Sequence, residues 1–298
     1  MSAVLEFLTS EYSIHLVILV GMYLILSQSL NLTFGLGQLF NLAHIASYAI
    51  GAYTTALLST ELEMPFFVCI TASVALSALM ALLLGGISLR LTTDYFAVGT
   101  LAFSSVITAL LINWKSLTHG VLGIPGIPRP EIGRTDYYNN SAFLGLLYIF
   151  VVIVLWLSYI AQKGRFGRSL RATAEYEQAA STLGTNVGAT RTIAFLISSA
   201  CAGLAGSFFA YYLNYIDPSS FSLGEMIFVL TIVIIGRPGS FWGCIGGTVF
   251  LVLLPEPLRF LDLPSAYLGP LRQLLHSVIL FAVVWWKRDS IFPKQRKV

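Results

Sequence analysis

The apolar residues of this chain gather in long runs that polar residues rarely interrupt. A helix that crosses the hydrocarbon core of a bilayer needs about 20 such residues, because each adds about 1.5 Å along the axis. Seven runs qualify, at 14–33, 40–58, 66–89, 94–113, 141–161, 191–213 and 271–287. Two shorter runs, 224–236 and 240–256, are separated by Arg237-Pro238-Gly239 and form either two short or broken spans or one re-entrant hairpin. Counted as two, they complete a prediction of about nine transmembrane helices in an all-α, polytopic membrane protein.

The composition supports this interpretation. Of the 298 residues, 56% are hydrophobic and only 10% are charged, whereas a soluble domain carries about 25% charged residues. A soluble enzyme, a disordered chain and a secreted disulfide-rich domain are therefore excluded. We expect residues 1–298 to form one transmembrane domain in the lipid bilayer, with no nucleic-acid partner.

The charges predict the orientation. If the segment Lys163–Arg191 is cytoplasmic, alternation of the spans places 12 of the 17 Lys and Arg residues on that side and 10 of the 14 Asp and Glu residues on the other. An excess of Lys and Arg on the cytoplasmic side is the usual rule for such proteins. We therefore expect a bacterial-type inner (plasma) membrane protein with its N-terminus outside and its C-terminus in the cytoplasm.

The sequence shows no energy source of its own. Asp94, Glu225 and Arg272 are expected near the ends of spans, and no charged residue is expected in the middle of one, where ion-coupled pumps usually place them. No phosphate-binding glycine loop, no metal-ligand spacing and no convincing catalytic cluster occurs. The chain is therefore predicted to be no enzyme, to bind no cofactor or metal, and to depend on a partner for energy; a membrane enzyme or a structural partner is the minor alternative.

One polar stretch interrupts the apolar pattern between residues 31 and 44. Gln28 and Asn31 are spaced to share a helix face, as are Asn41 and His44, and the glycines of Phe34-Gly-Leu-Gly-Gln38 interrupt the helix between them. Broken helices often build transporter sites, but amides also cap helix ends at a turn between two spans. The candidate translocation path is therefore Gln28, Asn31, Gln38, Asn41 and His44, with a cytoplasmic turn as the alternative.

A second stretch carries hydroxyl groups at regular spacing. Thr100, Ser104 and Thr108 recur every four residues and form one stripe on a helix. They extend the candidate path, although hydroxyls in membrane helices also bond to their own helix or to a neighbour. Small residues one turn apart, at Ala202 and Gly206 and at Gly243 and Gly247, predict closely packed helices.

The segment 164–190 is too charged to span. Its apolar positions from Ala172 to Leu183 follow helical spacing and Gly184 is a natural terminator, so we predict one amphipathic rod from Ser169 to Gly184. Such a rod suits docking into a groove of another protein, or a position on anionic lipid. Its candidate docking residues are Arg168, Arg171, Glu175, Glu177, Ala179, Ala180 and Gly184.

Within this segment the sequence resembles a known family. Glu177-Gln-Ala-Ala-Ser-Thr-Leu-Gly184 is similar to the Glu-Ala-Ala…Gly loop by which ABC importer permeases contact their ATPase subunits. It differs by an extra residue after the glutamate and lacks the usual Ile-x-Leu-Pro, as in permeases for branched-chain amino acids, urea, short amides and sugars. Further agreements are Asn31-Leu-Thr-Phe-Gly-Leu-Gly-Gln38, Ile50-Gly-Ala-Tyr53, Thr93-Asp-Tyr-Phe-Ala-Val-Gly-Thr-Leu101, Gly123-Ile-Pro-Gly-Ile-Pro128, Arg237-Pro-Gly-Ser240 and the terminal Trp-Trp-Lys-Arg.

This resemblance implies the permease subunit of an ATP-driven importer, of the type that carries the Thr-Asp-Tyr-Phe-Ala motif. It implies four kinds of contact: with a second, homologous permease subunit, with two cytoplasmic ATPase subunits that bind ATP and magnesium, with an extracytoplasmic solute-binding protein, and with the bilayer. It also implies branched-chain or other hydrophobic amino acids as cargo, with urea or short amides as the alternative. The loop 114–140, which carries Trp114, Arg129, Arg134 and Asp136, is either the contact for the binding protein or a simple connector.

Overall fold

The computed structural model describes residues 11–88, 93–132, 135–256 and 265–291. Each of the nine predicted apolar segments contains a helix: α2 Glu11–Leu30 with its π-helical continuation η1 Asn31–Leu36, α3 His44–Thr60, α4 Phe66–Ser88, α5 Thr93–Asn113, α7 Asn140–Lys163, α10 Val187–Leu213, α11 Leu223–Ile235, α12 Phe241–Leu253 and α13 Ser265–Ile291. Five described helices are long and apolar enough to cross a membrane: α2 with η1, α4, α5, α7 and α10. The predicted all-α, polytopic membrane fold is confirmed.

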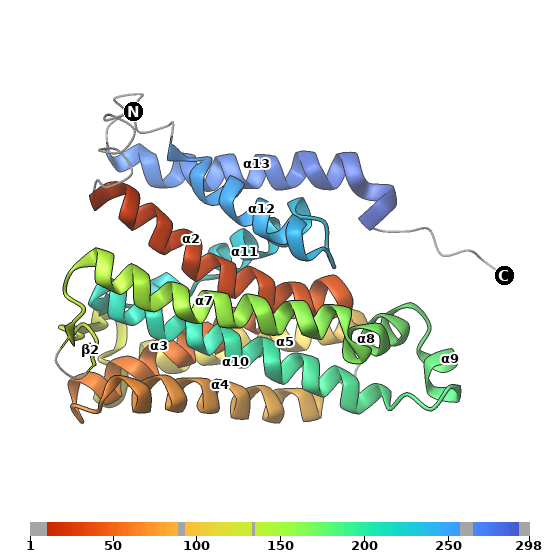
Figure 1. Cartoon of the computed structure of the whole chain (residues 1–298), viewed down its shortest axis with the longest axis horizontal. Helices are drawn as coiled ribbons and strands as arrows, with labels where there is room; N and C mark the ends of the chain where they lie inside the picture. The colour runs from red at the N-terminus through yellow and green to blue at the C-terminus, as the bar shows by residue number, and fades with distance from the viewer. Residues whose placement is uncertain (1–10, 89–92, 133–134, 257–264, 292–298) are drawn as a thin grey trace.

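The helices run along the long axis of the molecule, with α11, α12 and α13 on one side of α2 and most of the others on the opposite side (Figure 1). The closest packing joins α3, α4 and α10, where glycine and serine replace larger side chains. A Cβ on Gly206 would collide with the carbonyl oxygen of Tyr48, and Ser77 donates to the carbonyl of Ser47 at 3.0 Å. The small residues predicted to pack closely therefore do so, because only they let these backbones approach.

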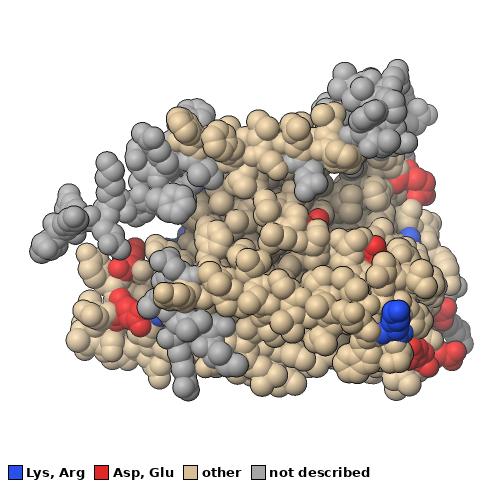
Figure 2. Space-filling view, turned by 180° about the vertical axis from the view of Figure 1, so that it is seen from behind, with Lys and Arg blue, Asp and Glu red and all other residues tan. Residues whose placement is uncertain are grey.

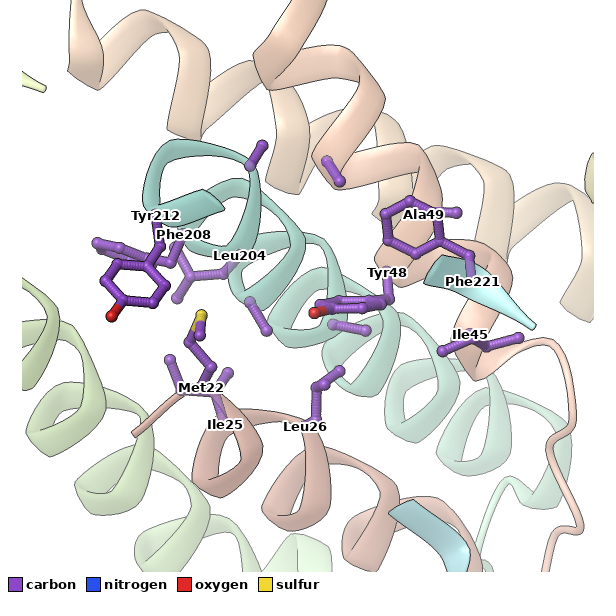
Figure 3. Close-up of a cluster of buried hydrophobic side chains, with 14 of the residues drawn as sticks. Met22, Ile25, Leu26, Ile45, Tyr48, Ala49, Leu204, Phe208, Tyr212 and Phe221 are labelled. Atoms are coloured by element: carbon purple, nitrogen blue, oxygen red, sulfur yellow. The ribbon is translucent and has the colours of Figure 1, made fainter. Parts of the chain in front are cut away.

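Large side chains fill the space between α2, α3 and α10. Figure 3 shows this cluster, with Met22, Ile25 and Leu26 on α2, Ile45, Tyr48 and Ala49 on α3, Leu204, Phe208 and Tyr212 on α10, and Phe221 beside them. Phe221 belongs to the 3₁₀ turn η3, Pro218–Phe221, which leads from α10 into α11. Its ring meets Tyr48 at 5.2 Å and Tyr53 at 5.9 Å, so this connection enters the bundle instead of passing over it.

The two ends of the bundle differ. One end carries the loop 114–140 with α6 Lys115–Thr118, η2 Gly120–Leu122 and the strands β1 Ile124–Pro125, β2 Glu131–Ile132 and β3 Thr135–Asp136. There β1 pairs with β4, Tyr215–Ile216, and β2 pairs with β3, both antiparallel. The opposite end carries α8, Arg165–Glu175, and α9, Glu177–Thr182, to which we refer as the α8 end (Figure 1).

Charged side chains gather at these two ends and are sparse between them (Figure 2). Among the described side chains, those of Lys163, Arg165, Arg168, Arg171 and Arg191 belong to α7, α8 and the start of α10. Arg90 and the basic tail 292–298, which also entered the predicted charge balance, lie outside the described residues. The middle, where charged side chains are sparse, is the part that a bilayer would surround.

The helices α11 and α12 form a hairpin of two short arms. Each has 13 residues, and so rises about 20 Å, less than the roughly 30 Å of hydrocarbon. The arms are in backbone contact: a Cβ on Gly243 would collide with the Gly236 carbonyl, and one on Gly247 would lie 2.7 Å from the Ile232 carbonyl. The structure therefore gives two separate helices, with their connecting turn at 236–240.

Glu225 lies near the end of its own helix but contacts the middle of another. Glu225 lies in the first turn of α11, as expected, but this helix begins inside the bundle. Its carboxylate accepts a hydrogen bond of 2.6 Å from Tyr23, which lies midway along the run from Glu11 to Leu36. The hydropathy pattern could not show this contact, because it does not record how α11 packs against α2.

Candidate functional site

The predicted rod from Ser169 to Gly184 is not continuous. α8 ends at Glu175, Tyr176 adopts an extended conformation with φ −147° and ψ 91°, and α9 begins at Glu177. The helical spacing continues through this point, but the backbone does not. The segment is therefore an elbow of two helices.

The bend changes which residues reach the surface. Tyr176 and Leu183, predicted on the packed face of the rod, are 75% and 85% exposed. The buried positions are instead Gly167, Leu170, Thr173 and Ala180. Of the candidate docking residues, Ala180 is buried and six are exposed: Arg168, Arg171, Glu175, Glu177, Ala179 and Gly184.

An open hollow of about 1000 Å³ lies along the elbow. Its lining comes from α8, α9 and the connection to α10, and consists of Glu175, Tyr176, Glu177, Gln178, Ser181, Gly184, Thr185, Asn186 and Val187. An exposed aromatic side chain such as Tyr176 is typical of a surface that binds another protein, because aromatic residues are enriched at interfaces. Three of the candidate docking residues, Glu175, Glu177 and Gly184, contribute to it.

One arginine that the sequence did not single out holds the elbow in place. Arg191, in the first turns of α10, pairs with Glu177 at 3.0 Å and reaches the carbonyl of Thr173 at 3.5 Å. Gly184 follows α9 with φ +84°, a conformation that favours glycine. The elbow is thus tied at both arms to the beginning of α10.

The other face of α8 is anchored on the end of α2. Leu170 is fully buried against Leu32 and Leu36 of η1 and Ala194 of α10. A Cβ on Gly37 would lie 3.3 Å from Leu170, so the absence of a side chain there makes room for α8. Movement of α8 would therefore press directly on η1.

The amides Gln28 and Asn31 face the turn of the α11–α12 hairpin. Asn31 accepts from the Gly239 N–H at 2.8 Å and donates to the Ser240 carbonyl at 3.2 Å, and Gln28 donates to the Phe241 carbonyl at 2.9 Å. Both are fully buried. Because Gln28 and Asn31 share one face of the helix, as predicted, both can bind the turn of the hairpin.

Gln28 has a second partner that the sequence analysis did not identify. Gln162, near the end of α7, is buried and donates to the Gln28 side-chain oxygen at 3.3 Å. A buried amide two residues before the helix-terminating Gly164 carries no distinguishing sequence signal. The pair joins α7, α2 and α12 through polar contacts.

The remaining polar residues of the stretch 38–44 separate from one another. Gln38 is exposed at the α8 end with φ +50° and lines a smaller hollow with Arg171 and Glu175. Asn41 precedes α3, which begins at His44, so these two residues do not share a helix face as expected. His44 is buried between helices, with its ring nitrogens near Ser29 at 3.2 Å and Ser198 at 3.3 Å.

The hydroxyl stripe on α5 faces the protein only in part. Thr100 is buried and accepts from the Leu42 N–H at 3.2 Å, so it holds the irregular segment before α3. Ser104 is buried, and the partly buried Thr108 donates to the Ser104 carbonyl of its own helix at 3.0 Å. The three hydroxyl groups lie on one stripe of α5, as predicted. Only Thr100 of these three is described as bonding a residue of another segment, Leu42.

At the opposite end, Arg129 is occupied within the fold. Its guanidinium lies 5.3 Å from the ring centres of both Phe143 and Tyr212 and donates to Asn140 at 3.0 Å. Trp114 is about half exposed, whereas the side chains of Arg134 and Asp136 lie outside the described residues. The loop therefore offers Trp114 more readily than Arg129 to any protein that binds there.

Comparisons with known proteins agree with this arrangement. Residues 12–284 match the family described as the branched-chain amino acid transport system permease component. The high-affinity branched-chain amino acid transport system permease protein LivM of Escherichia coli K12 is 33% identical over 97% of this chain and 72% of its own length. The autoinducer 2 import system permease protein LsrC of Photorhabdus laumondii is 28% identical over 65% of this chain and 60% of its own length.

No solved structure matches the chain. The family match nevertheless covers nearly all of the described helices, including α8, α9 and the hairpin. A family whose members are permease components also explains a chain with many apolar helices and one charged elbow at its end. The chain belongs to the family of branched-chain amino acid transport system permease components.

Proposed function

We propose that this chain is one of two permease subunits of an ATP-driven importer for branched-chain or other hydrophobic amino acids. The second permease, two ATPase subunits and a solute-binding protein complete the complex. The observation that carries the proposal is the exposed elbow α8–α9 with its hollow, at one end of a family-matched bundle. The ATPase subunits would supply the energy, since they bind ATP and magnesium.

In this proposal the α8 end faces the cytoplasm. The described basic residues of α7, α8 and α10 lie there, in agreement with the excess of Lys and Arg on the cytoplasmic side of membrane proteins. The loop 114–140 then faces outside, where the solute-binding protein would dock. Glu11, which begins α2 beside Asn140, lies at this outer end.

The contacts indicate how ATP-driven movement would reach the bundle. An ATPase bound at the elbow moves α8, and Leu170 transmits the movement to Leu36 and the rest of η1. Asn31, at the start of η1, holds the turn at Gly239, so the α11–α12 hairpin follows. Because Leu170, Leu36 and Asn31 are buried, a small displacement of α8 is carried along this route.

The test is uptake of radiolabelled leucine by the complete complex in liposomes. Glu177→Arg places a second cation beside Arg191, and Gly184→Pro cannot keep φ +84°, because proline fixes φ near −65°. We expect both variants to assemble in the membrane and to lose uptake and substrate-stimulated ATP hydrolysis. Glu61→Arg, an acid-to-cation change at an exposed turn of the opposite end, is the matched control and should keep both.

Unchanged uptake in either elbow variant contradicts the proposed docking site. Competition between leucine and urea in the same liposomes decides the cargo: inhibition by leucine alone supports a hydrophobic amino acid. If the wild-type complex moves urea and ignores leucine, the amino-acid assignment is wrong.

A further inference from the structure

An acidic side chain lies at the middle of the bundle. Glu225 accepts from the Tyr23 hydroxyl at 2.6 Å, and Tyr23 is midway between Glu11 and Leu36, roughly 18 Å from either end of that helix. Glu225 itself is only partly buried. It is therefore partly accessible, beside the middle of a helix long enough to cross a membrane.

The surroundings of this carboxylate are aromatic. Phe228 meets the Tyr23 ring edge-on at 5.0 Å, and Tyr48 is close enough to interact electrostatically with Glu225. Among the described residues the one ion pair joins Arg191 to Glu177, so no Lys or Arg of the described part neutralises Glu225. An ionised group inside a membrane protein is costly without a partner and usually marks a functional site.

The helix start favours the ionised form of Glu225. An acid in the first turn of a helix is stabilised by the partial positive charge of the N-terminal N–H groups. Ser222 begins α11 without a side-chain capping bond, and Glu225, although spaced to close a capping box with it, bonds Tyr23 instead. The carboxylate is thus directed across to α2.

Buried aromatic side chains pack between this point and the outer end. Phe221 precedes α11 and packs on both Tyr48 and Tyr53 of α3, of which Tyr53 is closer to that end. The Tyr53 hydroxyl is buried and has no hydrogen-bond partner. Figure 3 shows the Tyr48 ring between Leu26 and Phe221, with its hydroxyl pointing away from Phe221.

We infer that Glu225 binds the amino group of the passing solute, so that an α-amino acid with an apolar side chain supplies the cation that no described Lys or Arg side chain provides. The ammonium group pairs with the carboxylate, and the rings of Phe228 and Tyr23 accommodate the apolar side chain. This inference rests on the proposed function and adds a selectivity step within the membrane. It explains why an acid with no described Lys or Arg partner lies beside the middle of α2.

The test compares Glu225→Gln with wild type in the complete complex in liposomes. Glutamine keeps the shape and the acceptor for Tyr23, and removes only the charge. We expect the number of leucine molecules moved per ATP hydrolysed to fall at least tenfold, while ATP hydrolysis and assembly persist. Glu61→Gln, the same change at an exposed turn, should leave the ratio within threefold of wild type.

A ratio within threefold of wild type for Glu225→Gln overturns the inference, since a purely structural hydrogen bond would survive this change. A wild-type complex that does not import leucine contradicts the proposed function itself, which keeps the two failures distinct. If the variant does not assemble, chemical labelling of Glu225 in the wild-type complex tests the inference instead. Dicyclohexylcarbodiimide, which modifies carboxyl groups in apolar surroundings, should label Glu225, and leucine during turnover should lower that labelling at least threefold; labelling that is absent or unaffected by leucine refutes the inference.

Discussion

Asn31 is the residue whose loss should most clearly separate the hairpin from the rest of the bundle. Its side-chain oxygen accepts a hydrogen bond from the Gly239 N–H, and Asn31→Ala leaves this partly buried donor without that acceptor, at about 1–3 kcal/mol. The Ser240 carbonyl also receives the Cys244 N–H at 3.1 Å, so losing its second bond adds only about 0.6 kcal/mol. We expect the free energy of unfolding to fall by about 2–3 kcal/mol.

Equilibrium unfolding of the purified chain in mixed detergent micelles measures this change. Asn113→Ala is the matched control, because Asn113 lies at an exposed helix end and bonds only the Ala109 carbonyl of its own helix, at 2.8 Å. We expect the control to stay within about 0.5 kcal/mol of wild type. In liposomes, Asn31→Ala should also lower leucine uptake per ATP several-fold, because the hairpin no longer follows η1.

The geometry around Asn31 offers an independent check. A Cβ on Gly35 would collide with both the Asn31 side-chain oxygen and the Gly239 backbone nitrogen. Gly35→Ala should therefore loosen the same contact without removing any polar group. If both variants unfold like Asn113→Ala, the hairpin turn is held by other contacts and the reasoning is refuted.

Three further substitutions test the packing. Gly206→Leu should reduce the amount of folded protein in thermal unfolding assays, because its side chain would collide with the Tyr48 carbonyl, whereas Gly86→Leu, with open space around it, should not. Leu170→Ala should cost about 2–5 kcal/mol in detergent unfolding, since it empties a fully buried site between α8 and η1; a smaller loss would show that α8 is not anchored there. Arg191→Gln removes a partly exposed ion pair worth about 0–1 kcal/mol, so stability should hardly change while ATPase copurification falls; retained copurification would contradict the role of the elbow.

The elbow and the hairpin show where sequence reasoning ends. Helical spacing continues through Tyr176, so nothing local predicts its extended backbone. Arg191 bonds both Thr173 and Glu177, on either side of the bend, and these contacts exist only once α10 is in place. Similarly, the sequence allowed Asn31 to belong either to a translocation path or to a cytoplasmic turn. Its partners Gly239 and Ser240 become adjacent to it only once the α11–α12 hairpin has packed against η1.

The sequence by itself determined the class of the protein and the positions of its helices. A bilayer forces every spanning segment to be long, apolar and helical, so the hydropathy pattern located all nine helices and isolated the charged segment that carries the family motif. Tertiary structure decided where Glu225 lies in the bundle and which residues become hydrogen-bond partners. Glu225 lies beside the middle of α2 because the strand β4 and the 3₁₀ turn η3 carry the chain into the bundle before α11 begins, and hydropathy records no such path through space.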